Sequence, residues 1–545
     1  MLAKVRSVIS PRGQPPPKPP SEESSTSIPP PKIGMVVDMT DTHLIGGIIP
    51  VITGGDKQQH PYCRPEFLYL TEDEISLSAD QTIRPVMCPK YPTQMPVYAG
   101  YAEVINTGKS KENEDMAAAK ILSLVQQGYE AEKAIEIEDK RRDSSNKKQQ
   151  KLQREPSDDD LLVITQSFSS DDGPVAPKAE AAFFGLFDGH AGSGAAIMTA
   201  NCLHEHIKSR LNEVLESVMH LNRQEQLLRA KKSSFYSMEN ENWEESKHQS
   251  IINSDSLIIG ALEAAFVDMD EQIAEEKTYV KVTGGCAVIV LFVFLGKVYV
   301  ANAGDCRAIL ITLNKVLQLS NDFNPVQERK RLQYIAYQNN DIISQHFSRL
   351  EYSRYLTSKD LNRKVLFRDW YMDGWAAKTV REPDLKPPLI STRTRKPRLL
   401  NTIGVCRGFG DHHLMTADDN IAIKTFLSPF PEVQVFDVRT LDTLTDREVI
   451  VMASDGLWDV LNNDDVAEIV RSSLSNNDVD DFSKFTLVAQ ELVAAARGEQ
   501  VGQFKWKLSN GGMASTDDIT VFVIPLKFAV NLPKGDDDDD EELLS

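Results

Sequence analysis

Aspartates recur at the ends of apolar runs along this chain, mostly beside a glycine. Asp188 follows AAFFGLF, Asp305 follows YVANAG, and Asp455 follows VIVMAS. Asp517 and Asp518 stand directly before the run ITVFV. Apolar runs of this length and composition are typical of buried strands, and glycine lets the backbone turn sharply or approach a ligand closely. Carboxylates at the ends of neighbouring strands can therefore converge on one point.

Such a cluster of ionised aspartates repels itself unless protons or cations neutralise it. Oxygen ligands without thiols suit Mg²⁺ or Mn²⁺. One Asp-Gly pair on its own indicates no more than a turn. The segments DGHAG, DGLWD and STDDIT, however, occur together and in this order, and the combination predicts a site for divalent cations.

The apolar pattern also predicts the elements that would position these carboxylates. Helices are expected to begin at residues 191 and 257 and to cover 465–474 and 487–496. Because strands and helices do not alternate strictly, we expect an α+β fold with largely antiparallel sheets. Strands are expected at 181–187, 286–295, 298–303, 448–453 and 519–524, the second and third being joined by a hairpin turn at Gly296-Lys297.

The chain is 545 residues long, with 41% hydrophobic and 26% charged residues and a formal net charge of -20. The hydrophobic content is ordinary for a globular protein. So acidic a chain repels phosphate backbones and anionic lipid, which argues against a nucleic-acid partner and against broad membrane binding.

Several segments fall outside the apolar pattern. The Pro/Ser-rich residues 1–60 and the charged insertion 130–178 are expected to be disordered, as is the polar stretch 223–250. For the two charged stretches, a solvated helix is the alternative. Residues 529–545 form an acidic tail. The N-terminus has too short an apolar core for a signal peptide and allows at most weak membrane contact.

The cysteines bear on the compartment. The six cysteines are scattered and form no CxxC pair, which indicates free thiols in a reducing compartment. We therefore expect a cytoplasmic location, with the nucleus and peripheral membrane association as alternatives.

The segments FDGHAG, NAGDCRA, GVCRGFGD, ASDGLWDV and TDDITV together resemble the ordered signature of the metal-dependent serine/threonine protein phosphatases, the type 2C or PPM family. RPEFLYLTEDEISLSAD, GYAEVINTGKS, GWAAKTV and RGFGDHHL resemble its H/J/M branch. The resemblance implies a single phosphatase catalytic domain at 61–528. Its fold would be an α-β-β-α sandwich of two antiparallel sheets, with the metals between the sheets at one end.

The resemblance also implies a role for each site residue. His190 would be the general acid, and Asp188 would bridge two Mg²⁺ or Mn²⁺ ions. The other direct ligands implied are the backbone carbonyl of Gly189 and the carboxylates of Asp455 and Asp517. Glu114 and Asp115 would act through metal-held waters. Asp305 would join Asp455 and Asp459 at a weaker third site.

The implied reaction is hydrolysis of phosphoserine or phosphothreonine on proteins. A hydroxide that bridges the two cations would attack phosphorus while the cations neutralise the phosphate charge. His190 would protonate the departing serine or threonine oxygen. The alternative is a pseudophosphatase that only binds partners, but such a protein would be expected to lose metal carboxylates, and Asp188, Asp455 and Asp517 are all present.

The sequence departs from the family pattern around the substrate phosphate. Many members carry arginine where this chain has Ser110, so Lys109 or Lys111 would supply the positive charge, without arginine's bidentate fork. Arg407 is a third candidate, which either orients an active-site carboxylate or forms an ordinary ion pair. Asp518 stands where asparagine often follows the metal aspartate, which adds negative charge.

Residues 313–400, called the flap here, occupy the position at which the family carries a flap that helps to choose substrates. The flap is rich in Arg, Lys, Tyr and Trp. A basic, aromatic surface beside a phosphate site suits a folded phosphoprotein partner, although a solvated face is the alternative. The H/J/M resemblance implies phosphorylated Rab-type small GTPases as a substrate class.

Overall fold

The computed structural model describes residues 63–125, 178–235, 252–276, 282–394, 396–441, 443–478 and 480–532, which fall within one unit spanning Ile49–Ser545. The predicted segment 1–60, the insertion 130–178 apart from Lys178, and the acidic tail beyond residue 532 lie outside the described residues. The predicted division into domains therefore stays a prediction.

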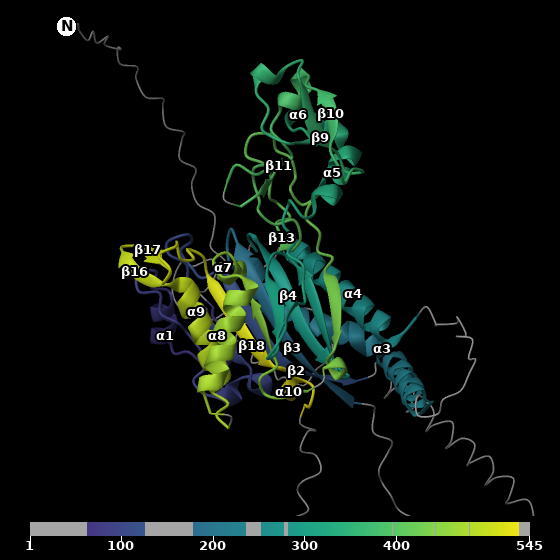
Figure 1. Cartoon of the computed structure of the whole chain (residues 1–545), viewed down its shortest axis with the longest axis vertical. Coiled ribbons are helices and arrows are strands. Elements are labelled where there is room, and N and C mark those ends of the chain that lie inside the picture. Colours follow the sequence, from purple (N-terminus) through teal and green to yellow (C-terminus); the bar gives the residue numbers. More distant parts are fainter. Residues whose placement is uncertain are drawn as a thin grey trace, which may run out of the picture. The chain divides into compact units, whose positions relative to one another are not determined.

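Two antiparallel sheets form the centre of the described structure (Figure 1). The first has the order β1 (Gly100–Val104), β18 (Ile519–Pro525), β15 (Val449–Ala453), β6 (Arg307–Ile311) and β7 (Val316–Gln318). The second has the order β14 (Glu432–Asp437), β5 (Lys297–Ala303), β4 (Gly285–Phe294), β3 (Lys178–His190) and β2 (Asp115–Val125), and β13 (Phe409–Gly410) pairs with β4.

Alternation along the strands explains why the two sheets stack. Successive side chains of a strand point to opposite faces, and on β3 Phe184 and Leu186 face the other sheet, where they share a core with Phe522 of β18. Phe183 and Phe187, one position along, face away from that sheet into a core with helix residues. Both faces of β3 are therefore buried, which explains its nearly continuous apolar sequence.

Helices cover the two outer faces, so the layers run α-β-β-α (Figure 1). Helices α3 (Gly194–Phe235) and α4 (Ser254–Glu275) pack on the second sheet. Helices α8 (Asn463–Asn476) and α9 (Lys484–Arg497) pack on the first. The predicted α+β sandwich of antiparallel sheets is confirmed.

The predicted elements are present, and one expectation was wrong. Every expected strand and helix overlaps an observed one, with ends that differ by up to three residues, and β4 and β5 form the predicted hairpin. The stretch 223–250 was expected to be disordered, but its first part, up to Phe235, continues helix α3. Over residues 223–229, where burial is described, no residue is buried and Leu227 and Leu228 are exposed, so this stretch lacks the stripe of buried residues that would have indicated a helix.

The flap has its own small core and its own short elements. Leu332, Leu389 and Leu399 of the flap share with Phe426, from the segment after it, a buried cluster that is separate from those of the sandwich. The flap helices and strands are α5 (Arg329–Gln338), α6 (Asn340–His346), β8 (Glu351–Tyr352), β9 (Lys364–Arg368), β10 (Ala376–Thr379), β11 (Ile390–Ser391) and β12 (Arg398–Leu399).

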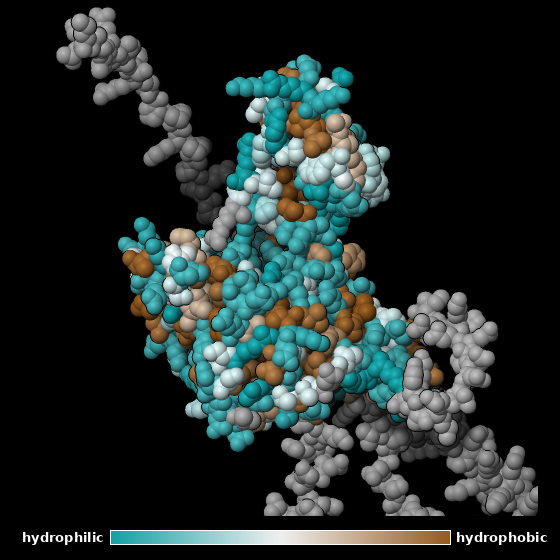
Figure 2. Space-filling model, in the orientation of Figure 1, coloured by the Kyte–Doolittle hydropathy of each residue, from teal (hydrophilic) through white to brown (hydrophobic). Residues whose placement is uncertain are grey.

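Besides short 3-10 helices, the described structure contains three further α-helices and one further hairpin: α1 (Glu72–Ser78), α7 (Asp455–Trp458), α10 (Leu526–Ala529), and β16 (Glu499–Gly502) paired with β17 (Lys505–Lys507). The face shown in Figure 2 is largely hydrophilic, with apolar residues scattered over it. Within the described ranges, no helix combines the length and apolarity needed to cross a bilayer.

Candidate active site

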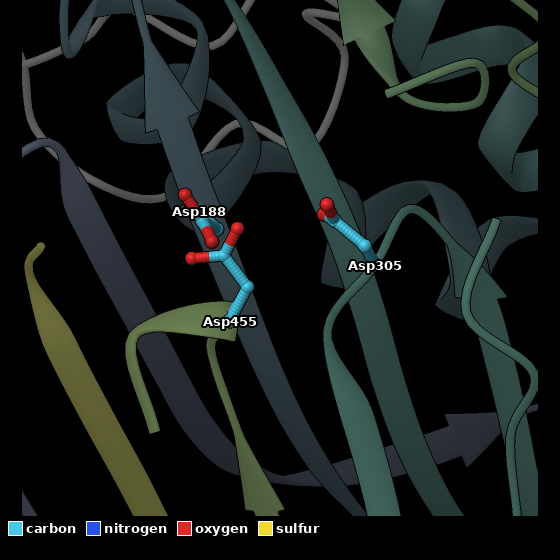
Figure 3. Close-up of side chains that lie close together, drawn as sticks. All are labelled: Asp188, Asp305 and Asp455. Carbon is cyan, nitrogen blue, oxygen red and sulfur yellow. The ribbon is translucent and has the colours of Figure 1, made fainter. Parts of the chain in front are cut away.

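Three aspartates from separate elements meet at one end of the sandwich. Asp188 lies near the end of β3, Asp305 follows β5, and Asp455 is the first residue of α7, just after β15. Each can offer a carboxylate oxygen, and these oxygens lie within 4.8 Å of one another. Figure 3 shows the carboxylates of Asp188 and Asp455 facing each other, with Asp305 beside them.

Asp115 joins this cluster through strand register. It begins β2 and lies directly opposite Asp188 on β3. The hydroxyl of Thr520, on the other sheet, donates a 2.8 Å hydrogen bond to the Asp115 carboxylate. Burial raises the pKa of Asp115 well above its usual range, and the charge of Asp518 raises it further. Burial and the charge of Asp455 do the same to the pKa of Asp188.

Asp305 also lies in an unfavourable environment for a charge. Burial and the charge of Asp455, partly offset by Lys396, raise the pKa of Asp305 to about 7. Carboxylates whose pKa values are raised by one another's charges gain from any cation placed among them.

Asp517 and Asp518 lie side by side in sequence and have different environments. The Asp517 carboxylate forms an ion pair with Lys109. The Asp518 carboxylate instead accepts backbone hydrogen bonds from Asn106, at 2.7 Å, and from Glu114, at 3.1 Å. Burial and the charge of Asp517 raise the pKa of Asp518 to about 7. Asp518 therefore fixes the loop that carries Glu114.

Two lysines supply positive charge to the cluster. Lys396 comes from the flap, and its amine contacts Asp455 and lies 2.9 Å from Asp459. Burial lowers the pKa of Lys396, but Asp455, Asp459 and Asp305 raise it by more. The pKa of Lys109 is likewise raised on balance, because the carboxylate of Asp517 outweighs burial. Both amines remain charged at neutral pH.

His190 is held by an aspartate that the sequence reasoning missed. Its Nε2 donates to Oδ2 of Asp411 at 2.7 Å. Burial lowers the pKa of His190, but the hydrogen bond and charge of Asp411 raise it by more. Asp411 was present in the quoted segment GVCRGFGD, where only Arg407 was considered.

Glu114 ties the start of β2 to the loop after His190. Its carboxylate accepts a 2.7 Å hydrogen bond from the backbone of Gly192. A side chain at Gly189 would meet the Glu114 carbonyl oxygen at 2.4 Å, so only glycine fits there. These contacts set the backbone on which Asp188 and His190 are carried.

Two buried arginines, Arg84 and Arg64, hold the backbone of the segments that carry the carboxylates. Arg84 is fully buried and donates to the carbonyls of Ser515 and Asp517, both at 2.9 Å. Arg64 donates to the Asp115 carbonyl at 3.0 Å. No local sequence signal pointed to either residue, because their partners lie far along the chain.

The other two candidates for the substrate phosphate have different surroundings. Arg407 donates to both carboxylate oxygens of Glu328, at 3.0 and 3.1 Å, and its third contact is the Phe430 carbonyl at 3.0 Å. This is the ion-pair alternative stated for Arg407. Lys111 is exposed. Of the three predicted basic residues, Lys109 is the one in contact with a cluster carboxylate.

The donor set fits Mg²⁺ or Mn²⁺. Asp188, Asp305 and Asp455 supply carboxylate oxygens at short mutual distances, and such oxygen-rich sets are what these cations prefer. The mutual repulsion expressed in the raised pKa values is a cost that bound cations would remove.

Comparison with known proteins gives a consistent family. The family model described as "Protein phosphatase 2C" matches residues 145–387 and 387–502. Mouse "Protein phosphatase 1H" is 39% identical over 490 residues, covering 86% of this chain and 91% of the mouse protein. The zebrafish (Danio rerio) 1H protein is 37% identical over 527 residues, covering 90% and 98%.

The J branch is represented as well. Mouse "Protein phosphatase 1J" is 37% identical over 473 residues, covering 85% of this chain and 86% of the mouse protein. The predicted resemblance to the H/J part of the family is thus confirmed. Among solved structures, a serine-threonine phosphatase 2C from Toxoplasma gondii has a TM-score of 0.34 at 16% identity, covering 81% of this chain and 99% of that one.

Proposed function

Because this chain belongs to the protein phosphatase 2C family of metal-dependent serine/threonine protein phosphatases, we propose that it hydrolyses phosphoserine and phosphothreonine at the cluster of Asp188, Asp305 and Asp455. The observation that carries the proposal is the convergence of these three carboxylates within 4.8 Å from three separate elements. Structural acids are normally paired with basic side chains, whereas Asp188 and Asp305 lie among other carboxylates and Asp455 shares its one lysine contact, Lys396, with Asp459.

The proposed ligands divide between two main ions and a weaker third. Two Mg²⁺ or Mn²⁺ ions would be held by Asp188, the Gly189 carbonyl, Asp455 and Asp517, with Glu114 and Asp115 acting through waters. Asp305, Asp455 and Asp459 would hold the third ion. When bound, such cations activate a water for attack on phosphorus and neutralise phosphate charge.

The proton for the leaving group comes from His190 in this proposal. Asp411 holds Nε2 at 2.7 Å and raises the pKa of His190, so the ring is protonated over a wider pH range. Its Nδ1–H would then donate to the departing serine or threonine oxygen. Asp411 acts as a positioning residue, because it reaches the substrate only through His190.

Lys109 is the proposed ligand of the substrate phosphate. Its amine contacts Asp517, and its side chain is 54% exposed, so it lies at the edge of the site and is open to substrate. Arg407, engaged with Glu328, is better described as a link between the flap and the segment before β13.

The test uses the full-length chain and a phosphothreonine peptide, with Mn²⁺, with Mg²⁺ and with chelator. We expect turnover only with metal, and a loss of at least about 10³-fold in Asp188→Ala. The matched control is Asp373→Ala, which removes a flap carboxylate that is 87% exposed and paired with Lys330. The control should retain wild-type turnover.

Failure would be informative in a specific way. Wild-type protein that binds Mn²⁺ but cleaves no peptide would point to the pseudophosphatase or to an obligatory protein substrate. A panel of phosphorylated folded proteins separates the two, since a pseudophosphatase would bind without releasing phosphate.

For the substrate, we propose phosphorylated Rab-type small GTPases. The support is the branch resemblance together with the aromatic side chains exposed on the flap, among them Tyr337, Tyr371 and Trp375. A phosphorylated Rab-type protein should be cleaved with a higher kcat/KM than a peptide of the same local sequence. Equal values would contradict a role for the flap. The cytoplasmic location, weak membrane contact through the N-terminus and absence of a nucleic-acid partner stay predictions.

A further inference from the structure

The flap reaches the active site through the tip of one hairpin. Strands β11 and β12 pair Ile390 with Leu399 and Ser391 with Arg398. The base of this hairpin is anchored, because Leu399 is fully buried in the flap core. Lys396 lies in the loop between the two strands, on the side of the metal-site carboxylates.

The hairpin tip is also fastened to the flap. The Arg393 guanidinium carbon lies 3.7 Å from the centre of the Tyr355 ring, and the Tyr355 hydroxyl is 3.0 Å from the Ser391 hydroxyl. Stacked guanidinium and ring contacts of this kind are stabilising. Where the Lys396 amine lies is therefore tied to where the flap lies.

The Lys396 amine lies against carboxylates that a bound cation would also use. Its amine contacts Asp455 and is 2.9 Å from Asp459. In the proposed function, these two carboxylates hold the third, weaker ion together with Asp305. Two positive charges a few ångströms apart repel strongly in a partly buried site, and a carboxylate oxygen that faces the ammonium is shielded from a metal ion.

We propose that Lys396 and the third cation compete for Asp455 and Asp459, so that binding of that cation releases the hairpin tip from the active site. This inference rests on the proposed function, because it takes the cation sites as given. Linkage makes the effect reciprocal. When Lys396 holds the flap against the active site, the affinity for the third cation falls. When the flap is drawn away, for example by a docked protein, that affinity rises.

The first measurement is a calorimetric titration with Mn²⁺ at fixed pH, which resolves the tight and the weak binding sites and gives the affinity of each. It compares wild type with Lys396→Met, which removes the charge, and with Lys396→Arg, which keeps it. The matched control is Lys364→Met, which removes an exposed flap lysine on β9. We expect Lys396→Met to bind the weak ion about tenfold more tightly or better. Lys396→Arg and Lys364→Met should stay close to wild type.

The second measurement follows the lysine itself and does not depend on a variant that folds. In wild type, modification of Lys396 by an amine-reactive reagent, read by mass spectrometry, should rise over the Mn²⁺ range that fills the weak site. Modification of Lys364 should stay constant.

The outcomes separate the inference from the function beneath it. Tighter weak-site binding in Lys396→Met, with rising modification of Lys396 in wild type, supports the competition. Unchanged or weaker binding in Lys396→Met, or constant modification of Lys396, overturns it while the tight sites leave the proposed function intact. Absence of the tight Mn²⁺ events from wild type overturns the proposed function and the inference with it.

Discussion

The carboxylates of the flap and those of the active site have opposite surroundings. In the flap, Asp369 lies 2.9 Å from Arg349 and Asp360 lies 2.6 Å from Arg354. The hydrogen bonds of Arg354 and the Thr357 backbone lower the pKa of Asp360. In the active site, burial and a neighbouring carboxylate raise the pKa of Asp305 to about 7.

The difference shows how one residue type serves two purposes. Flap aspartates are neutralised by basic side chains of the chain itself, so they contribute to the structure as they stand. Asp188 and Asp305 mostly face other acids, so the folded chain gains from cations supplied from outside. The surroundings of an aspartate, rather than its burial alone, indicate which purpose it serves.

The largest effect is expected from a substitution of Asp188, which tests whether this acid differs from those of the flap. Asp188→Asn should lower phosphopeptide turnover by at least about 10³-fold. In chelator, the same variant should melt at a higher temperature than wild type, because a mutually repelling charge has been removed. Turnover with Mn²⁺ measures the loss of activity, and thermal melting in chelator measures the gain in stability. A lower melting temperature in chelator would show that Asp188 is a structural acid like those of the flap.

The second test is the counterpart in the flap. Asp369→Asn leaves Arg349 without its partner and should destabilise the flap by about 3 kcal/mol, because the Asp369 side chain is only 3% exposed. Chemical denaturation monitored at the flap tryptophans measures the loss. Peptide turnover should change little. The exposed Asp373→Asn serves as the control, with no measurable change in stability expected.

Asp411 shares features with both groups of aspartates, since it lies at the candidate site but, like the flap aspartates, has a basic partner, His190. Asp411→Asn should lower kcat about 10- to 100-fold. Asp411 raises the pKa of His190, so the protonated ring persists to higher pH with it than without it. In the variant, the alkaline fall of kcat should move to lower pH. An unchanged pH profile would contradict the role of His190 as general acid.

The smallest expected effect concerns the lysines. Lys109→Met should raise KM for a phosphopeptide about tenfold, because a charge at the edge of the site is lost. Lys111→Met should raise KM less, since both lysines are exposed but it is Lys109 that contacts the Asp517 carboxylate. Steady-state kinetics of the two variants would settle which lysine replaces the usual arginine. The reverse order would move the phosphate site toward Lys111.

Much of this fold could be predicted from local patterns. The runs that became β3, β4 and β15 are apolar on both faces because each is covered by a sheet on one side and helices on the other. The polar end of α3 could not be predicted in this way. Leu227 and Leu228 are exposed, and no residue is buried over 223–229, the part of this end whose burial is described.

The site was predictable where its residues stand in motifs, and less so where they depend on distant partners. Asp188, Asp305 and Asp455 were found from their place at strand ends. Arg84 could not be found, because its hydrogen-bond partners Ser515 and Asp517 lie at the other end of the chain. Lys396 belonged to a stretch noticed only for its basic composition, since nothing local shows that it meets Asp455.

The register of β2 and β3 has a consequence for protein engineering. Asp115 pairs with Asp188 at one end of this ladder, and Val125 pairs with Lys178 at the other. At about 3.4 Å per residue, the two ends are roughly 34 Å apart along the strand. The sequence 126–177 joins the strands at the distant end, so a fluorescent reporter or affinity tag spliced into it would leave Asp115 and Asp188 in place. The opposite end tolerates no such graft, since a one-residue slip there would turn Asp115 to the other face of the sheet.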